Sequence, residues 1–218
     1  MNETLFEYLQ TYLTERRKQL IWEISAMRTR HFTVVTEDVY QMHNTSAVMR
    51  TCDVFGIQDL HVIDEAIGKR IDKEIAMGAQ KWVDVYRYRS TDDCIKKLKK
   101  SGYKIVATTP HEKSHTLDTF DIGQKSAFFF GKESEGLSDK VLEQADTSVY
   151  IPMYGFTESL NVSVSVAIIL QFVVSKMKKN DISWQLSEEE LEQLRFQWTK
   201  KCIKNADEIS TRFLKDNS

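Results

Sequence analysis

The sequence has few cysteines, and none of them is arranged to bind zinc. Cys52, Cys94 and Cys202 lie far apart and form no CxxC or cysteine–histidine pair at the spacing of zinc ligands. A sparse and odd number of cysteines is typical of proteins in a reducing compartment. The sequence therefore predicts no metal site and a reducing environment.

The sequence also lacks segments that direct a chain into a membrane. The first ten residues, MNETLFEYLQ, do not show the basic and then apolar pattern of a signal peptide. The longest apolar run, residues 162–174, is interrupted by Ser163, Ser165 and Gln171. It is shorter than the roughly 20 residues that cross a bilayer. We expect a cytoplasmic protein with no membrane partner.

A strong overall charge is missing too. The 30 lysine and arginine residues are balanced by 32 aspartate and glutamate residues, which leaves a net charge of −2. Nucleic acid would therefore have to bind through local basic groups. The length of 218 residues and the 41% hydrophobic content predict one domain with a sizeable core, with room for terminal additions.

Two common nucleotide-binding fingerprints are absent. No strand is followed by GxGxxG, the dinucleotide-binding pattern. The segment GKESEGLS, residues 131–138, has glycines at the spacing of a phosphate loop, but Leu137 stands where that loop needs lysine. These absences disfavour a phosphate-loop NTPase and a nucleotide-dependent oxidoreductase.

Alternating strand and helix patterns are present along most of the chain. The pattern of β-forming runs predicts strands over residues 31–39, 59–64, 82–88, 103–109, 126–131 and 147–152. Helical spacing predicts helices over residues 4–29, 44–56, 91–102, 138–146 and 161–179, and a helical tail after a capping box of Ser187 and Glu190. The fold class is therefore α/β, a mostly parallel sheet flanked by helices. We expect a core of residues 31–179 between helical extensions at 1–30 and 180–218.

Three polar loops follow strands or open helices: residues 43–51, 131–138 and 151–164. Considered singly, each has an ordinary structural explanation. Arg50 fits a solvated helix residue, and Asn44 and Asn161 fit helix N-caps. Glu133 fits an acid that interacts with a helix dipole.

Together the three loops resemble the ordered motifs of one family. N-x-x-A-x-x-R-T-x-D-x-x-G (44–56), FFFGKESEGLS (128–138) and IPMYGFTESLNVSVSVAIIL (151–170) are similar to the motifs of the SpoU branch of the SPOUT RNA methyltransferases. The resemblance covers roughly residues 28–175. The lead-in RTRHFTVVTEDVYQMHN and the helices at both ends resemble the TrmH type, the tRNA guanosine-2′-O-methyltransferases.

This resemblance implies an activity, a cofactor and a topology. The activity is methyl transfer from S-adenosylmethionine to a ribose 2′-hydroxyl of tRNA, at the D-loop guanosine of tRNA position 18. The family fold includes a C-terminal trefoil knot, a rare exception to unknotted topology. Family members are homodimers. The alternatives are another tRNA position, ribosomal RNA, or an RNA-binding module without catalysis.

The resemblance also implies which residues form the site. Thr108, Gly131, Ile151 and Leu160 would line the cofactor pocket, largely through backbone groups. Arg50 would reach the site across the dimer interface and contact the substrate.

Four further roles follow from the same motifs. Asn44 would orient Arg50 or the substrate, and Glu133 would order the loops. Ser159 and Asn161 would lie near the methyl donor or the ribose. Because a guanidinium is a poor base, we interpret Arg50 as a group that holds phosphate and stabilises a developing alkoxide.

RNA binding would need local basic clusters. The candidates are Arg16, Arg17, Lys18, Arg28 and Arg30 near the N-terminus and Lys200, Lys201 and Lys204 in the tail. Contacts of this kind give affinity for phosphates without sequence choice. Each cluster also fits an ordinary solvated face.

Overall fold

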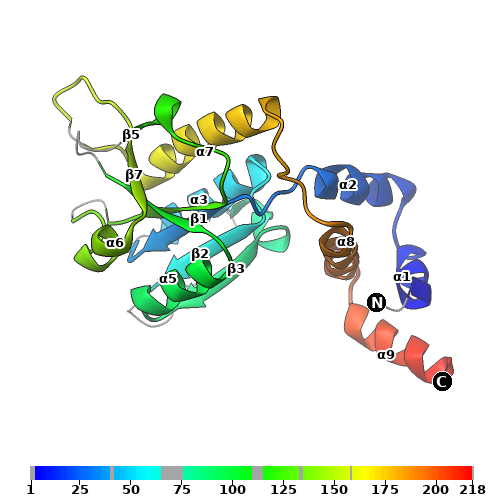
Figure 1. Cartoon of the computed structure of the whole chain (residues 1–218). Coiled ribbons are helices and arrows are strands. Elements are labelled where there is room, and N and C mark those ends of the chain that lie inside the picture. Colours follow the sequence, from blue (N-terminus) through cyan, green and yellow to red (C-terminus); the bar gives the residue numbers. More distant parts are fainter. Residues whose placement is uncertain are drawn as a thin grey trace. The chain divides into compact units, whose positions relative to one another are not determined.

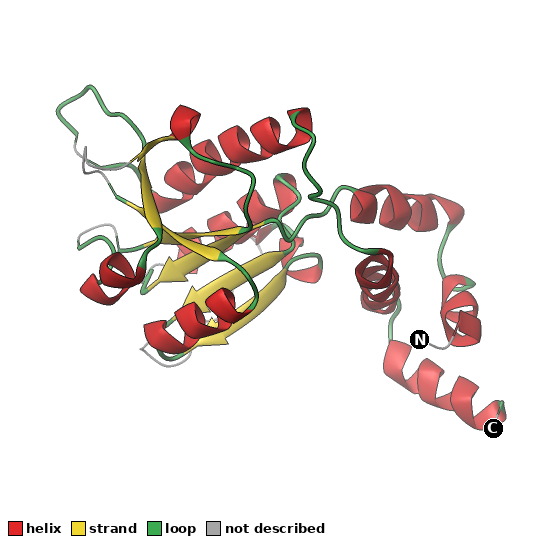
Figure 2. Cartoon of the chain, in the orientation of Figure 1, coloured by secondary structure: helices red, strands yellow, loops and turns green. Residues whose placement is uncertain are grey.

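The structure is a computed structural model that describes residues 3–39, 42–64, 76–109, 115–132, 135–157 and 159–217. The chain forms two compact units. One unit spans Thr29–Trp184, and the other combines Met1–Arg28 with Gln185–Ser218. Figure 1 follows the chain through both units, and Figure 2 distinguishes their helices and strands.

The larger unit is built on a seven-stranded sheet in which every described pair of neighbouring strands is parallel. The strand order is β3-β2-β1-β6-β4-β7-β5. The strands are β1 (Phe32–Glu37), β2 (Asp59–Ile63), β3 (Asp84–Tyr88), β4 (Lys104–Thr108), β5 (His115–Thr116), β6 (Ser126–Phe130) and β7 (Thr147–Tyr150). The predicted parallel α/β sheet is confirmed, and only the two-residue β5 was not anticipated.

Helices cover both faces of this sheet. α3 (Met42–Val54) and α7 (Val162–Lys179) pack on one face, and α5 (Thr91–Lys100) and α6 (Asp139–Gln144) pack on the other (Figure 1). The central strands β1, β2 and β6 are therefore buried along their whole length. Burial on both faces explains why β6, SAFFF, is a nearly continuous apolar run. β1 and β2 also bury polar side chains, such as Thr33, Thr36 and His61.

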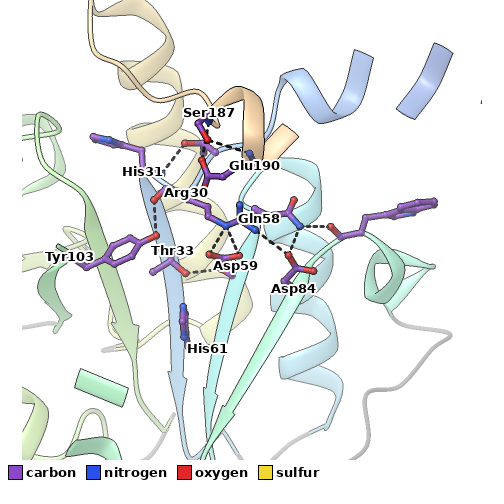
Figure 3. Close-up of polar contacts among 12 residues, drawn as sticks. Arg30, His31, Thr33, Gln58, Asp59, His61, Asp84, Tyr103, Ser187 and Glu190 are labelled. Carbon is purple, nitrogen blue, oxygen red and sulfur yellow. Dashed lines mark hydrogen bonds and ion pairs between the residues drawn. The ribbon is translucent and has the colours of Figure 1, made fainter. Parts of the chain in front are cut away.

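A polar network fixes the amino-terminal ends of β1, β2 and β3 to one another. The Arg30 guanidinium lies 3.1 Å from Asp59 and 3.3 Å from Asp84, and Gln58 donates to Asp84 at 3.1 Å (Figure 3). Tyr103, at the start of β4, donates its hydroxyl to the Arg30 carbonyl at 2.7 Å. These contacts set the strand register at the edge of the sheet where the strands begin.

The described residues of the smaller unit form four helices: α1 (Glu3–Gln10), α2 (Glu15–Ala26), α8 (Glu188–Cys202) and α9 (Ala206–Asp216). The prediction of a single helix over residues 4–29 is wrong, because Thr14 accepts a hydrogen bond from the Arg17 amide and starts a new helix. The capping box of Ser187 and Glu190 at the start of α8 is confirmed. The tail helix then ends before Asn205, which has a left-handed φ of 58° and separates α8 from α9.

None of the helices described in the structure is long and apolar enough to cross a bilayer. The most apolar long helix, α7, carries Ser163, Ser165 and Gln171 among its aliphatic residues and ends in three lysines. Its apolar residues are instead used in packing, because Val166, Leu170 and Val173 are fully buried against the sheet and α3.

Candidate active site

A cavity of about 760 Å³ opens at the carboxyl ends of β4, β6 and β7. In parallel α/β sheets, ligands bind at this end of the strands. The cavity is lined by the end of β4, the loop after β6, Leu142 of α6, the loop after β7 and the first half of α7. Four of its lining residues are Thr108, Gly131, Ile151 and Leu160, the set inferred for the cofactor, and Ser159 lines it as well.

The loop after β6 approaches itself so closely that residue 131 can only be glycine. Lys132 and Gly136 exchange backbone hydrogen bonds of 3.0 and 2.9 Å, and Gly136 has a φ of +74°. A Cβ atom on Gly131 would lie 2.0 Å from the Gly136 carbonyl oxygen. A side chain at residue 131 would therefore force this loop open and change the cavity wall.

The cavity lining combines buried apolar side chains with polar ones such as Lys132, Thr157 and Ser159. Leu137, Val149 and Ile169 line it and are buried. Thr108 uses its hydroxyl to donate to the Phe129 carbonyl at 2.6 Å, so that its side chain supports the wall. A flat apolar ligand with hydrogen-bonding edges would fit such a lining.

A hydrogen bond connects the first and third polar loops. The Asn161 side-chain amide donates to the Asn44 side-chain oxygen at 3.1 Å, across 117 residues of sequence. The Asn161 oxygen accepts from the Ser163 amide at 2.9 Å and from the Ser163 hydroxyl at 2.6 Å. Asn161 is therefore the N-cap of α7, as its simple structural reading predicted.

Asn44 is not a helix N-cap. α3 already begins at Met42, so Asn44 lies inside its first turn, where its side chain is buried and faces Asn161. The sequence predicted a helix start at Asn44 because a polar residue there precedes the apolar positions, but α3 begins two residues earlier. The side chain is used for the contact between loops.

Arg50 projects from α3 as an exposed side chain and does not line the cavity of its own chain. It forms no ion pair with any carboxylate in the described ranges. Asn44 and Asn161 do not line the cavity either. Asn161 directly follows Leu160, which does, and Asn44 is bonded to Asn161. Glu133 falls outside the described residues, so its predicted role stays a prediction.

Glu37 is an acid that sequence reasoning missed. It ends β1, is only 4% exposed, and accepts hydrogen bonds from the Thr91 hydroxyl at 2.6 Å and from the Ser138 amide and hydroxyl at 2.9 and 2.8 Å. It thereby ties the starts of α5 and α6 to the end of β1. The sequence does contain one sign of this role, a carboxylate at the end of a strand predicted to be buried. A charged group in such a place is buried only when hydrogen bonds satisfy it.

Two of the basic residues suggested for RNA binding have structural roles. Arg28 is 1% exposed and lies over the Trp198 ring, with its guanidinium carbon 5.2 Å from the ring centre. A buried guanidinium cannot contact a phosphate in solvent, so the prediction for Arg28 is wrong. Arg30 is engaged by Asp59 and Asp84.

Three side chains on β2, β3 and α5, none of which lines the cavity, have shifted pKa values: His61, Tyr88 and Cys94. His61 is stacked between Tyr86 and Tyr88, and burial together with the charge of Lys97 lowers its pKa to about 4. Burial raises the pKa of the Cys94 thiol to about 12 and raises the pKa of Tyr88. These groups stay neutral at physiological pH, as buried groups do.

No group of three metal-ligating side chains comes together within the described part of the chain. The cavity itself presents loops, a glycine turn and the neighbouring Asn44–Asn161 pair. This arrangement, on a parallel sheet with helices on both faces, defines an α/β protein with a small-molecule site at the strand ends.

The comparisons with known proteins identify the family. The SpoU rRNA Methylase family matches residues 31–171, which is more than half of the chain. The chain belongs to this family of RNA methyltransferases. The resemblance found in the three sequence motifs is thereby confirmed.

Two relatives and one solved structure match nearly the whole chain. The tRNA (guanosine(18)-2′-O)-methyltransferase of Borreliella burgdorferi is 38% identical over 197 residues, which cover 90% of each chain. The enzyme of the same name from Aquifex aeolicus is 32% identical over 89% of this chain and 92% of its own. The crystal structure of the A. aeolicus TrmH/SpoU tRNA modifying enzyme has a TM-score of 0.80 at 30% identity, covering 88% of this chain and 98% of that one.

Proposed function

We propose that the chain methylates the ribose 2′-hydroxyl of guanosine 18 in the D-loop of tRNA, with S-adenosylmethionine as the methyl donor. One observation carries this proposal: the relatives that match about nine-tenths of both chains, terminal segments included, are named for this reaction. The family is named for ribosomal RNA, whereas these relatives are named for tRNA, which favours tRNA as the substrate. A tRNA substrate would place the protein in the cytoplasm.

The cavity fits the proposed cofactor. Its volume of about 760 Å³ lies in the range of small-molecule sites, and its mixed apolar and polar lining suits an adenine ring with hydrogen-bonding edges. The close approach at Gly131 leaves backbone of the second loop directly at the cavity wall. When bound there, S-adenosylmethionine would supply an electrophilic methyl group on its sulfonium.

Arg50 would act on the RNA. Its guanidinium stays protonated, so it would hold a phosphate of the target nucleotide through paired hydrogen bonds and stabilise negative charge as the 2′-hydroxyl loses its proton. Most of the acceleration would come from holding the hydroxyl in line with the donor. The proton acceptor would be a phosphate oxygen or water.

The remaining motif residues would position these groups. Asn44 and Asn161, joined by their hydrogen bond, would fix α3 relative to the third loop and so set the position of Arg50. Ser159, exposed on the cavity rim, would contact the ribose or the methyl donor. Glu133 would order the second loop through backbone N–H groups.

The active form would be a homodimer in which Arg50 serves the cavity of the partner. Val164 and Ile168 on α7, and Leu160 just before it, are exposed apolar residues at helical spacing, with exposed fractions of 44%, 36% and 37%. An exposed apolar surface of this kind suits a two-fold interface. It also accounts for an Arg50 that does not line the cavity of its own chain.

Subunit mixing tests this arrangement. Arg50→Ala and Gly131→Val each disable a different half of a shared site, so both homodimers should be inactive. After the two are unfolded and refolded together, heterodimers hold one intact site, and about a quarter of the wild-type activity should return. No recovery from a mixture shown to contain heterodimers would mean that Arg50 serves its own chain.

We carry two further features over from the family as proposals. The C-terminal part of the catalytic unit would form a trefoil knot, as in the SPOUT family that the sequence motifs resemble. Residues 31–179 would be the catalytic domain, with residues 1–30 and 180–218 as helical extensions that contact RNA.

Transfer RNA from a deletion strain tests the substrate. Guanosine 18 should lack its 2′-O-methyl group in that tRNA, and the purified protein with S-adenosylmethionine should restore it. Methylation restored at another tRNA position, or in ribosomal RNA, would support the corresponding alternative substrate. A deletion without any change in ribose methylation would support the non-catalytic RNA-binding alternative.

A further inference from the structure

A concentrated basic surface lies on α5, away from the candidate active site. Residues 87–104 hold seven lysine and arginine residues and two aspartates, whereas the rest of the chain holds 23 basic and 30 acidic residues. A net charge of +5 on 18 residues therefore stands against −7 on the remainder. Such a local excess needs an explanation in a chain with a net charge of −2.

The helix separates its residues cleanly into two faces. Cys94, Ile95 and Leu98 are almost completely buried against the sheet. The exposed residues of the last two turns are Lys96, Lys97, Lys99 and Lys100. We call these four side chains the lysine face.

The lysine face is not neutralised by acids of the same helix. None of its four lysines forms an ion pair with a carboxylate in the part of the chain that the structure describes. Lys99 donates to the Gln144 carbonyl, and Lys97 lies over the Tyr86 ring. Asp92, in the first turn, is bonded instead to Gln144 and paired with Lys140 on α6.

Helix stability alone does not account for this arrangement. A basic residue in the last turn interacts favourably with the helix dipole. Lys96 with Lys99, Lys96 with Lys100, and Lys97 with Lys100 are also pairs at helical spacing, and like charges at such spacing repel. A bound polyanion would remove this repulsion.

The lysine face lies on the second half of α5, which runs from the carboxyl ends of the strands toward their amino-terminal ends, and none of its four lysines lines the cavity. α5 begins at Thr91, which is bonded to Glu37 at the carboxyl end of β1, and its last residue is followed by Lys104 at the start of β4. Its ten residues span about 15 Å between these ends. The exposed Lys125 adds to the charge there, since its carbonyl accepts from the Lys104 amide.

We propose that the lysine face binds the phosphate backbone of the RNA substrate at a stretch remote from the methylated nucleotide. This proposal rests on the proposed function, which supplies an RNA large enough to reach both the cavity and the lysine face. Lysines on flexible stems suit phosphates without sequence choice. A membrane surface fits less well, because the apolar residues of α5 point into the protein and not outward.

Charge removal on the lysine face tests the proposal. The variant Lys96→Gln/Lys97→Gln/Lys99→Gln/Lys100→Gln is compared with the same four positions changed to Arg, which keeps the charge, and thermal melting checks that both are folded. Kd for unmodified tRNA is measured between about 50 and 200 mM salt. The Gln variant should bind tRNA about 10-fold or more weakly, with a slope of log affinity against log salt smaller by about 2 to 3.

The Arg variant should keep the wild-type Kd and slope. S-adenosylmethionine affinity should be the same in all three proteins, because none of the four lysines lines the cavity. A Gln variant with a Kd within about twofold of wild type and an unchanged slope would overturn the proposal. So would a loss of binding to vesicles of phosphatidylserine and phosphatidylcholine while tRNA binding stays intact.

This result is separate from the fate of the proposed function. Kd and the salt slope report the lysine face even if no methyl group is transferred. If the wild-type protein transfers the methyl group and the Gln variant binds tRNA as tightly as wild type, only the inference about α5 is contradicted.

Discussion

At the scale of single residues, Asn161 has two structural uses at once. Its side-chain oxygen caps α7, and its amide nitrogen reaches Asn44 in the first polar loop. A plain N-cap needs only the oxygen. The amide is therefore the part of the side chain that connects the loops.

Replacement of Asn161 by Asp separates these uses. The carboxylate still accepts from the Ser163 amide, so the free energy of unfolding should change by less than about 1 kcal/mol. It has no N–H for Asn44, so we expect the methyl-transfer rate to fall by about 10- to 100-fold through misplacement of α3. Chemical unfolding and single-turnover kinetics measure the two effects. An Asp variant with the wild-type rate would show that the contact has no positioning role.

Gly131 provides a second test at this scale. A methyl group at residue 131 would meet the Gly136 carbonyl at 2.0 Å, so Gly131→Ala should weaken S-adenosylmethionine binding by about 10-fold or more as the loop opens. Gly155→Ala is the matched control in the same cavity, because its Cβ would meet no atom closer than 3.9 Å. Calorimetry measures both affinities. Equal affinities in the two variants would contradict the account of the loop.

The sequence predicts some of these residues and contacts but not others. The Asn161 cap follows from a polar residue before an apolar helix, whereas the Asn44–Asn161 bond joins residues 117 positions apart and has no local signal. The set Thr108, Gly131, Ile151 and Leu160 came from the family resemblance, because its members share no side-chain chemistry. Glu37 was missed because its partners, Thr91 and Ser138, are brought to it by the fold.

At the scale of elements, Glu37 is the clearest point of connection. Three donors from the starts of α5 and α6 converge on one buried carboxylate. Hydrogen bonds to a charged group are stronger than those between neutral groups. The second polar loop, which leads into α6, is thereby held at the end of β1.

Replacement of Glu37 by Gln should lower the free energy of unfolding by about 2 to 3 kcal/mol. The neutral amide makes no charge-assisted hydrogen bonds, and its N–H groups keep contacts only where the Thr91 or Ser138 hydroxyl turns to accept. Glu143→Gln, at an exposed position of α6, should change stability by less than about 0.5 kcal/mol. Urea unfolding compares the variants. Equal midpoints would show that the carboxylate charge is not needed.

Helix boundaries show what periodicity alone cannot predict. The apolar spacing of residues 4–29 continues through the break at Thr14, since spacing records which face is buried and not where the backbone turns. Asn205 likewise interrupts a helical pattern by its left-handed conformation. The strands were predicted more closely, because buried parallel strands are short apolar runs bounded by polar residues.

At the scale of the whole molecule, the aromatic cluster below α5 makes stability depend on pH. His61 has a pKa of about 4 in the folded protein and about 6.5 in the unfolded chain. Between these values the unfolded chain binds the extra proton, so stability is complete above about pH 6.5 and is lost as the pH falls toward 4. The loss from this residue should amount to about 3 kcal/mol at most.

Unfolding by urea at several pH values between 4 and 7 measures this dependence. His61→Phe keeps a ring between Tyr86 and Tyr88 and removes the titrating nitrogen, so it should flatten the profile over this range. A variant with the same slope as wild type would assign the acid sensitivity to other groups.

The central claim concerns one oxygen atom of the substrate, the 2′-hydroxyl of guanosine 18. Unmodified tRNA and the same tRNA with 2′-deoxyguanosine at position 18 differ only in that oxygen. With purified protein and labelled S-adenosylmethionine, we predict one methyl group per molecule on the first RNA and none on the second. Equal labelling of both RNAs, or no labelling of the first, would contradict the proposed function.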